Sequence, residues 1–290
     1  MAWQFILNGF AAGSAYALVA LGVALQYRTT GFLNFGHGAS IAIGAYLAFF
    51  LSRSAGLPLA LAAIAAIVAA AMFGGLSQRL VYSPLQKKGA PSTVLLIASL
   101  GVYTVVQNMI SLIAGNDVQT LIANPVGIAI WGARLSPIQI TSIVFAVVMF
   151  TAFWWVTSST SVGKQWRAVG IDRELARAHG INLLTIDWTV ASVSGAVGAL
   201  AGIMMAADVS LFPTIGFKAL LMGVVAAVIG GLLTPKAAFI GGITVGLVQY
   251  LVAGVFSTRW QEAGIFVLLL FVLLIRPKGL SQVRNGTLKN

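Results

Sequence analysis

Long apolar runs separated by short polar segments constrain this sequence more than any other feature. Six of them have about 20 residues, the length that a helix needs to cross the roughly 30 Å hydrocarbon core of a bilayer. They cover residues 3–25, 57–76, 92–114, 138–156, 188–207 and 237–256, and shorter runs cover 39–51, 219–233 and 260–275. Within lipid, a helix satisfies its backbone polar groups by itself. The sequence therefore predicts an all-α integral membrane protein, a polytopic helical bundle of about 9 (8–10) transmembrane segments.

The low charge content excludes most other classes of protein. Only 8% of the 290 residues are charged, whereas a soluble domain carries about a quarter. The chain has no cysteine and only two histidines, and it lacks His-Glu-x-x-His and Gly-x-Ser-x-Gly motifs. We therefore expect no metal site, no cofactor and no enzymatic activity. The net charge of +11 comes from basic residues scattered over loops, which is typical of membrane topology, so membrane lipid is an expected partner and nucleic acid is not.

The distribution of Lys and Arg predicts the orientation in the membrane. If all nine apolar runs cross, the loops alternate between two sides, and 13 of the 17 basic residues fall on one side and four on the other. Basic residues accumulate in cytoplasmic loops, so segment 157–187 and the C-terminus are predicted to be cytoplasmic and the N-terminus external. Loop 116–137 then faces outward, and its Trp131 is either an interface anchor or a contact for a partner.

The longest polar interval, residues 157–187, contains a predicted short helix. Asp172 is a suitable N-cap, residues 173–179 form the helix, and Gly180 takes the C′ position that ends it. A helix of two turns does not recover its nucleation cost in water, so it must dock onto another surface. We therefore predict that this segment presents a surface to a soluble partner at the membrane face.

Polar groups within the apolar runs are few and uncharged. All six acidic residues fall in loops or at the ends of runs, so the buried carboxylates that are typical of proton- or sodium-driven carriers are missing. The neutral candidates for a translocation pathway are Asn8, Ser14, Tyr16, Gln107, Asn108 and Gln249. Each of them could instead form a hydrogen bond between helices. A pathway lined by such groups would suit a zwitterionic or uncharged solute.

Two of the shorter runs begin with similar glycine-containing segments. Residues 32–40 and 212–220 share Phe, Gly and Ala at three aligned positions and enter from opposite sides in the predicted topology. Paired short spans with glycine interruptions are typical of inverted repeats around a transport site, although chance similarity among common membrane residues is the other interpretation. In the first segment, Asn34 and His37 either present polar atoms to the pathway or cap and pack the helix.

The chain lacks the Gly-x-x-x-x-Gly-Lys-Ser/Thr motif, so it cannot bind nucleotide phosphates through that loop. If transport is driven by ATP, another polypeptide must bind it. The alternative is a secondary carrier or facilitator for a small neutral or zwitterionic solute that works without ATPase partners.

Several motifs, taken together, resemble the permease subunits of bacterial ABC importers for branched-chain amino acids. They occupy residues 7–18, 33–38, 44–46, 167–172, 180–182, 230–235, 241–246 and 276–280. The resemblance implies a non-catalytic, multi-pass subunit of the bacterial inner membrane whose partners are a second homologous permease subunit, two cytoplasmic ATPase subunits and a periplasmic solute-binding protein. Residues 1–280 would form a single transmembrane permease domain with a cytoplasmic coupling loop at 157–187, and residues 281–290 a short basic tail in the cytoplasm.

The resemblance also identifies the short helix as the coupling helix that docks in a cleft of the ATPase. By the family pattern, this role falls to Arg167, Asp172, Glu174, Ala176 and Gly180. Relatives often carry glutamate directly after the His-Gly pair and in the penultimate span, where this chain has Ala39 and Gln249. The expected solutes are therefore branched-chain or other hydrophobic amino acids, or related small amides, urea and carboxylates.

Overall fold

The protein is a bundle of helices, as predicted. A computed structural model describes residues 2–121, 127–130, 133–232 and 234–276. The longer helices in these ranges are α1 (Ala2–Thr30), α2 (Gly36–Arg53), α3 (Leu59–Ser77), α5 (Ser92–Ala114), α6 (Pro137–Ser159), α9 (Leu183–Asp208), α10 (Ile215–Gly230), α11 (Pro235–Val255) and α12 (Gln261–Ile275). The shorter elements are the π-helix η1 (Gln78–Tyr82), α4 (Ser83–Lys87), α7 (Ser161–Ile171), α8 (Arg173–Ala178), the 3-10 helix η2 (Thr258–Trp260) and the strands β1 (Ile128–Ile130) and β2 (Ala133–Leu135).

Seven helical segments in the described part of the chain are long and apolar enough to cross a membrane. Each of the six long apolar runs coincides with one of them, and the seventh, Thr258–Ile275, contains the shorter run at 260–275. Helices α2 and α10 account for the other two short runs, but α10 has only 16 residues and α2 does not belong to the seven. A total of nine crossing segments therefore stays a prediction.

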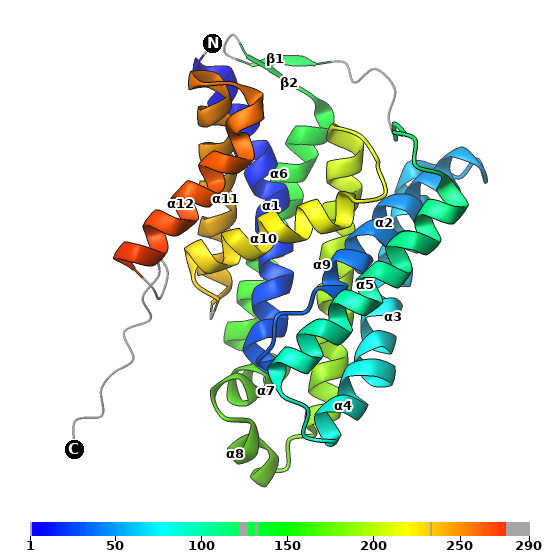
Figure 1. The fold of residues 1–290 in the computed structure, drawn as a ribbon, viewed down its shortest axis with the longest axis vertical. Helices are drawn as coiled ribbons and strands as arrows, with labels where there is room; N and C mark the ends of the chain where they lie inside the picture. The colour runs from blue at the N-terminus through cyan, green and yellow to red at the C-terminus, as the bar shows by residue number, and fades with distance from the viewer. Residues whose placement is uncertain (1, 122–126, 131–132, 233, 277–290) are drawn as a thin grey trace.

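The two ends of the bundle carry different elements (Figure 1). The N-terminus lies at one end together with the antiparallel hairpin of β1 and β2, in which Ile128 pairs with Leu135. Helices α4, α7 and α8 lie at the opposite end. Because the positive-inside count assigned the segments of α4, α7 and α8 to the cytoplasm, we name this second end the inner end and the first the outer end. Trp131 and the predicted tail 281–290 lie outside the described residues.

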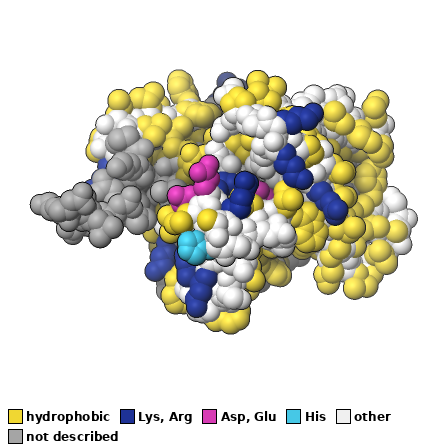
Figure 2. Space-filling view, turned by 90° about the horizontal axis from the view of Figure 1, so that it is seen from below, with side chains coloured by type: hydrophobic (Ala, Val, Ile, Leu, Met, Phe, Trp, Pro, Cys, Tyr) yellow, Lys and Arg dark blue, Asp and Glu magenta, His cyan; other side chains and the backbone are white. Residues whose placement is uncertain are grey.

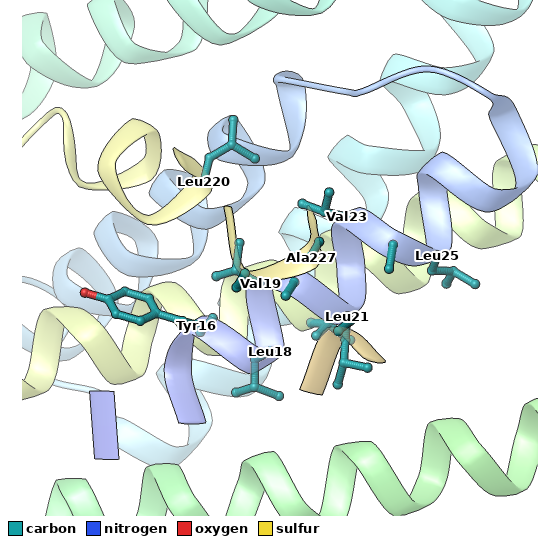
Figure 3. Packing of buried hydrophobic residues seen from close by; sticks show 14 of the residues in the cluster. Tyr16, Leu18, Val19, Leu21, Val23, Leu25, Leu220 and Ala227 are labelled. Atoms are coloured by element: carbon teal, nitrogen blue, oxygen red, sulfur yellow. The ribbon is translucent and has the colours of Figure 1, made fainter. Parts of the chain in front are cut away.

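Helix α1 is the central element of the bundle. It packs against α6, α9, α10 and α11, and its residues Leu18, Val19 and Leu21 are almost completely buried. Figure 3 shows these side chains among those of the neighbouring helices. A helix that is apolar on all sides is suited to this position because every face meets another apolar surface.

Glycines let α1 and α11 approach until their backbones touch. A Cβ atom added to Gly246 would lie 2.3 Å from the Cα atom of Gly13, and one added to Gly13 would lie 2.9 Å from the Cα atom of Ile243. Both helices repeat glycine at a spacing of four residues, at Gly9 and Gly13 and at Gly242 and Gly246, which is the small-xxx-small pattern of close membrane helix pairs. The outer half of α1 is therefore packed directly against α11.

The beginnings of α2 and α10 cross each other. Figure 1 shows the chain turning back from the inner end of α1 before α2 begins, and α10 lying across the bundle. A Cβ atom on Gly216 would lie 2.2 Å from the carbonyl oxygen of Gly38, so the two backbones are in contact. The rings of Phe35 and Phe217 lie 6.4 Å apart beside this contact. The two similar segments of the sequence are thus neighbours in space, while their origin as an inverted repeat stays a prediction.

The interval 157–187 contains more regular structure than the sequence analysis predicted. The short helix is confirmed as α8, because the Asp172 carboxylate accepts hydrogen bonds from the backbone N–H groups of Glu174 and Leu175 at 2.9 and 3.0 Å and Gly180 adopts a φ of +80°. Helix α7 was not predicted. It forms because Thr160 caps its first turn and because Trp166 is buried against the bundle, a tertiary contact that a polar sequence does not reveal.

Candidate functional site

A cavity with both polar and apolar lining residues, which we name the outer cavity, opens between six helices in the outer half of the bundle. It has a volume of about 220 Å³ and is bounded by α1, α6, the end of α9, the beginning of α10, α11 and the beginning of α12. Such a space holds far more than one water molecule, which needs only about 10–15 Å³ by the same kind of measure. Its polar lining includes Tyr16, Gln139, Asp208, Lys218 and Gln249.

Two of the predicted pathway residues meet in this cavity. Tyr16 on α1 and Gln249 on α11 are 6% and 8% exposed, and their side chains interact with each other. The side-chain oxygen of Gln249 has no hydrogen-bond partner among the described residues. Buried amide oxygens normally accept a hydrogen bond, so this atom is available to a donor that enters the cavity.

Two charged residues of the cavity were missed by the sequence analysis. Asp208 is the last residue of α9, and its carboxylate interacts with the side chains of Ser136 and Gln139 at the start of α6. Lys218 lies in the first turns of α10, and its ammonium group is 2.6 Å from the carboxylate of Glu262 on α12. Both residues stand next to an apolar run in the sequence and were assigned to loops. Their position on the predicted outer side, flanking the glycine-containing segment 212–220, was the available signal.

The other predicted pathway residues do not line this cavity. Asn8 accepts a hydrogen bond from Gln4, Ser14 donates to the Phe10 carbonyl oxygen in its own helix, and Asn108 donates to the Thr104 carbonyl oxygen on the exposed side of α5. Gln107 is half-buried on the same helix as Asn108. These local bonds favour the structural interpretation of Ser14 and Asn108.

His37 and Asn34 also have partners close to the start of α2. Asn34 accepts a hydrogen bond at 2.9 Å from the backbone N–H of Gly36, the first residue of α2, while Phe35 occupies the N-cap position. His37 is 1% exposed, and its Nδ1 atom lies 3.2 Å from the Ser194 hydroxyl on α9. The same hydroxyl donates to the Gly22 carbonyl oxygen on α1. His37 therefore connects α2 with α1 and α9 from a position away from the cavity lining.

At the inner end, one ion pair attaches α8 to the bundle. The Arg173 guanidinium donates two hydrogen bonds to the Asp187 carboxylate, at 3.0 and 2.7 Å, and a further one to the Thr29 carbonyl oxygen at the end of α1. Asp187 is 1% exposed because α9 begins at Leu183, before the predicted run at 188–207, and so includes this residue. A bidentate arginine contact fixes orientation as well as distance, so α8 is joined to both α1 and α9.

The predicted coupling residues have different environments. Asp172 and Glu174 are exposed and Gly180 ends α8, but Ala176 is buried in its own chain, where it packs in the main core. Arg167, on α7, is half-buried beside a small cavity at the inner end. Buried Ala176 thus contributes to seating α8, and the role of all five residues in coupling stays a prediction.

The exposed surface formed by α8 and the last residue of α7 combines charge with apolar side chains. Ile171 and Leu175 are 82% and 56% exposed, which is unusual for large apolar residues at a polar end of a membrane protein. Figure 2 shows this end of the molecule, with Lys and Arg side chains distributed over the face and only a few acidic ones. Exposed apolar groups within a charged rim are typical of a surface that binds another protein.

Comparison with known proteins places these features in a family. Residues 5–274 match the family described as "Branched-chain amino acid transport system / permease component". The chain is 30% identical to the high-affinity branched-chain amino acid transport system permease protein BraD of Pseudomonas aeruginosa and to LivH, of the same description, from Salmonella typhimurium. Each match covers 96% of this chain and 94% of the relative.

A solved structure has the same fold at low sequence identity. It is described as PsaBC from Streptococcus pneumoniae in complex with Fab, and it matches with a TM-score of 0.53 and 14% identity. The match covers 95% of this chain and 93% of that chain. It therefore extends over nearly all the helices described above and supports the fold alone.

Proposed function

The chain belongs to the family of permease components of branched-chain amino acid transport systems, and we propose that it carries hydrophobic amino acids or related small solutes across the bacterial inner membrane. It is a permease subunit, a non-catalytic and multi-pass membrane component of an ATP-driven importer. Such subunits work with ATPase and solute-binding partners. In the proposed complex these are two cytoplasmic ATPases, a periplasmic binding protein and a second homologous permease, and the C-terminus is cytoplasmic.

The attachment of α8 is the observation that carries the proposed mechanism. Arg173 joins α8 to Asp187 on α9 and to the end of α1, and both of those helices also line the outer cavity near their outer ends. A partner that binds α8 differently in two of its own states would shift the permease between two arrangements. A rigid connection from α8 to α1 and α9 would carry that shift to the cavity.

The exposed residues of α8 allow a direct test of this mechanism. Glu174→Lys reverses the charge of an exposed side chain, and Gly180→Val places a branched residue at a φ of +80°, which such residues rarely adopt. We expect both changes to lower solute uptake and stimulation of the ATPase in proteoliposomes containing the whole complex. The affinity of the solute-binding protein for its solute should stay normal.

A matched control separates coupling from general damage at this end. Lys88→Glu also reverses a charge on an exposed residue of the inner end, at the C-cap of α4, and should leave uptake within about twofold of the wild type because surface substitutions usually have small effects. Normal uptake in both the Glu174→Lys and Gly180→Val variants would contradict the assignment of α8. Solute flux through the permease alone, without ATPase, would instead favour a facilitator.

A further inference from the structure

We propose that the outer cavity is a binding site for the zwitterionic backbone of an amino acid, in which Asp208 faces the ammonium group and Lys218 faces the carboxylate. The cavity is the one bounded by α1, α6, α9, α10, α11 and α12. This inference rests on the proposed function and deepens it, because it assigns the parts of the solute to particular residues.

The charges of the cavity fit a zwitterion better than a simple ion. Among the described residues that line it, Asp208 is the acidic one and Lys218 the basic one. These two charges have opposite signs and so match the two ends of a zwitterion, while Glu262, which lies outside the lining, pairs with Lys218. The two residues come from the end of α9 and the first turns of α10, joined by the short segment 209–214, so the loop between the helices places both charges at one cavity.

Both charged groups keep capacity for a further partner. A carboxylate has about four acceptor positions, and the side chains of Ser136 and Gln139 do not use all of those of Asp208. An ammonium group has three donors, and the contact of Lys218 with Glu262 uses one. Lys218 is half exposed, so its remaining donors can reach a solute.

Gln249 supplies the independent sign of a missing ligand. Its side chain is more than nine-tenths buried, it lines the cavity, and its Oε1 atom lacks a hydrogen-bond partner among the described residues. Leaving such an acceptor unsatisfied is unfavourable. The N–H groups of an amino acid's ammonium would satisfy both this oxygen and Asp208, and Tyr16 interacts with the same glutamine side chain.

The apolar residues of the lining suit a hydrophobic side chain. It includes Ala11, Ala15, Met204, Met205, Phe212 and Ile215. The alanines leave room for a branched chain, and methionine side chains adapt their shape to an irregular apolar partner. The cavity thus offers a polar pole and an apolar wall, as an amino acid with an aliphatic side chain requires.

The experiment measures equilibrium binding to the permease–ATPase complex in lipid nanodiscs, without the solute-binding protein. Three probes share the isobutyl group: L-leucine, 3-methylbutylamine, which lacks the carboxylate, and 4-methylpentanoate, which lacks the ammonium group. Asp208→Asn should weaken L-leucine and the amine by at least about tenfold, as expected for a lost charge-assisted hydrogen bond, and leave the acid unchanged. Lys218→Met should weaken the binding of L-leucine and of the acid by a similar factor and leave the binding of the amine unchanged.

Glu262→Gln is the matched control for a purely structural role of Lys218. If Lys218 only holds α10 against α12, removing its partner Glu262 should reproduce the effect of Lys218→Met. If Lys218 binds the solute, Glu262→Gln should preserve L-leucine binding. Size-exclusion chromatography after heating shows whether each variant complex keeps its fold. If Asp208→Asn is unstable, Asp208→Glu takes its place as the test, and because it keeps the carboxylate it should retain most of the L-leucine binding.

The outcomes distinguish this inference from the proposed function. Equal weakening of all three probes, or L-leucine binding that neither variant changes, overturns the zwitterion site. The importer function would survive that result if the solute-binding protein still stimulates the ATPase of the wild-type complex. Probe-selective losses together with an ATPase that does not respond to a solute-binding protein would support the site and refute the importer.

Discussion

Replacing Arg173 by alanine should loosen α8 from the bundle and leave Asp187 as an unpaired buried carboxylate. Arg173 donates two hydrogen bonds to Asp187 and one to the Thr29 carbonyl oxygen. Asp187 is 1% exposed, whereas the side chain of Arg173 is 32% exposed. The variant therefore removes a partly solvent-exposed cation and leaves its fully buried partner anion unpaired.

The expected loss of stability lies between two limits. Removing one partner of a fully buried pair costs about 3–5 kcal/mol, whereas an exposed pair contributes about 0–1 kcal/mol. Because about a third of Arg173 is accessible to solvent, screening reduces the effect, and we expect about 2 kcal/mol, which is also within the range for hydrogen bonds to charged groups. This corresponds to roughly a 30-fold change in the equilibrium for seating α8.

Thermal unfolding and ATPase stimulation of the reconstituted complex are the assays. Arg173→Ala should lower the melting temperature and reduce ATPase stimulation by the solute-binding protein. The double variant Arg173→Ala with Asp187→Asn should recover part of the stability, because it no longer buries an unpaired charge, but should not recover stimulation. Arg177→Ala, on the exposed side of the same short helix, should change stability by less than about 0.5 kcal/mol.

The reasoning is refuted if the double variant is as unstable as Arg173→Ala. That result would mean that the cost comes from losing the Thr29 contact or the packing of the arginine stem, and that the burial of Asp187 is not decisive. An Arg177→Ala variant as unstable as Arg173→Ala would show that α8 responds to any loss of charge.

Two further predictions concern packing in the bundle. Gly246→Ala should prevent the close contact of α1 with α11, because the new Cβ atom would lie 2.3 Å from the Cα atom of Gly13. The yield of folded permease after detergent extraction should therefore fall. Gly101→Ala on α5, where nothing lies within 4 Å of the added Cβ atom, should leave that yield unchanged or higher. Ser194→Ala removes the hydroxyl that contacts His37 and the carbonyl oxygen of Gly22, and should lower the free energy of unfolding by about 1–2 kcal/mol. The measurement is the melting temperature, and an unchanged value would show that the contact of Ser194 with His37 does not stabilise the bundle.

Local signals in the sequence predicted the helices and the cap of α8. The positions of the apolar runs correspond to helices because a membrane segment must satisfy its own backbone hydrogen bonds whatever its neighbours are. The cap at Asp172 and the turn at Gly180 depend on a few consecutive residues, and both were found. The family also follows from short motifs that can be identified without knowing which helices touch.

Only the tertiary structure decided which polar residues belong together. Tyr16 and Gln249 share the cavity, whereas Asn108 faces outward on α5 and Ser14 bonds within its own helix. Helices that are apolar around their whole circumference carry no periodic pattern to mark the side that faces a neighbour.

The charged residues show most clearly the difference between what the sequence indicates and what the packed structure decides. From the sequence alone, Asp187 and Asp208 look like solvated ends of apolar runs, but α9 includes both. One is buried against Arg173 and the other lines the cavity with Lys218. The sequence by itself determined that this chain has helices long and apolar enough to cross a membrane, while the side that its basic segments face stays a prediction. The contacts between distant helices determined where its few charges lie, because burial and pairing are properties of the packed bundle.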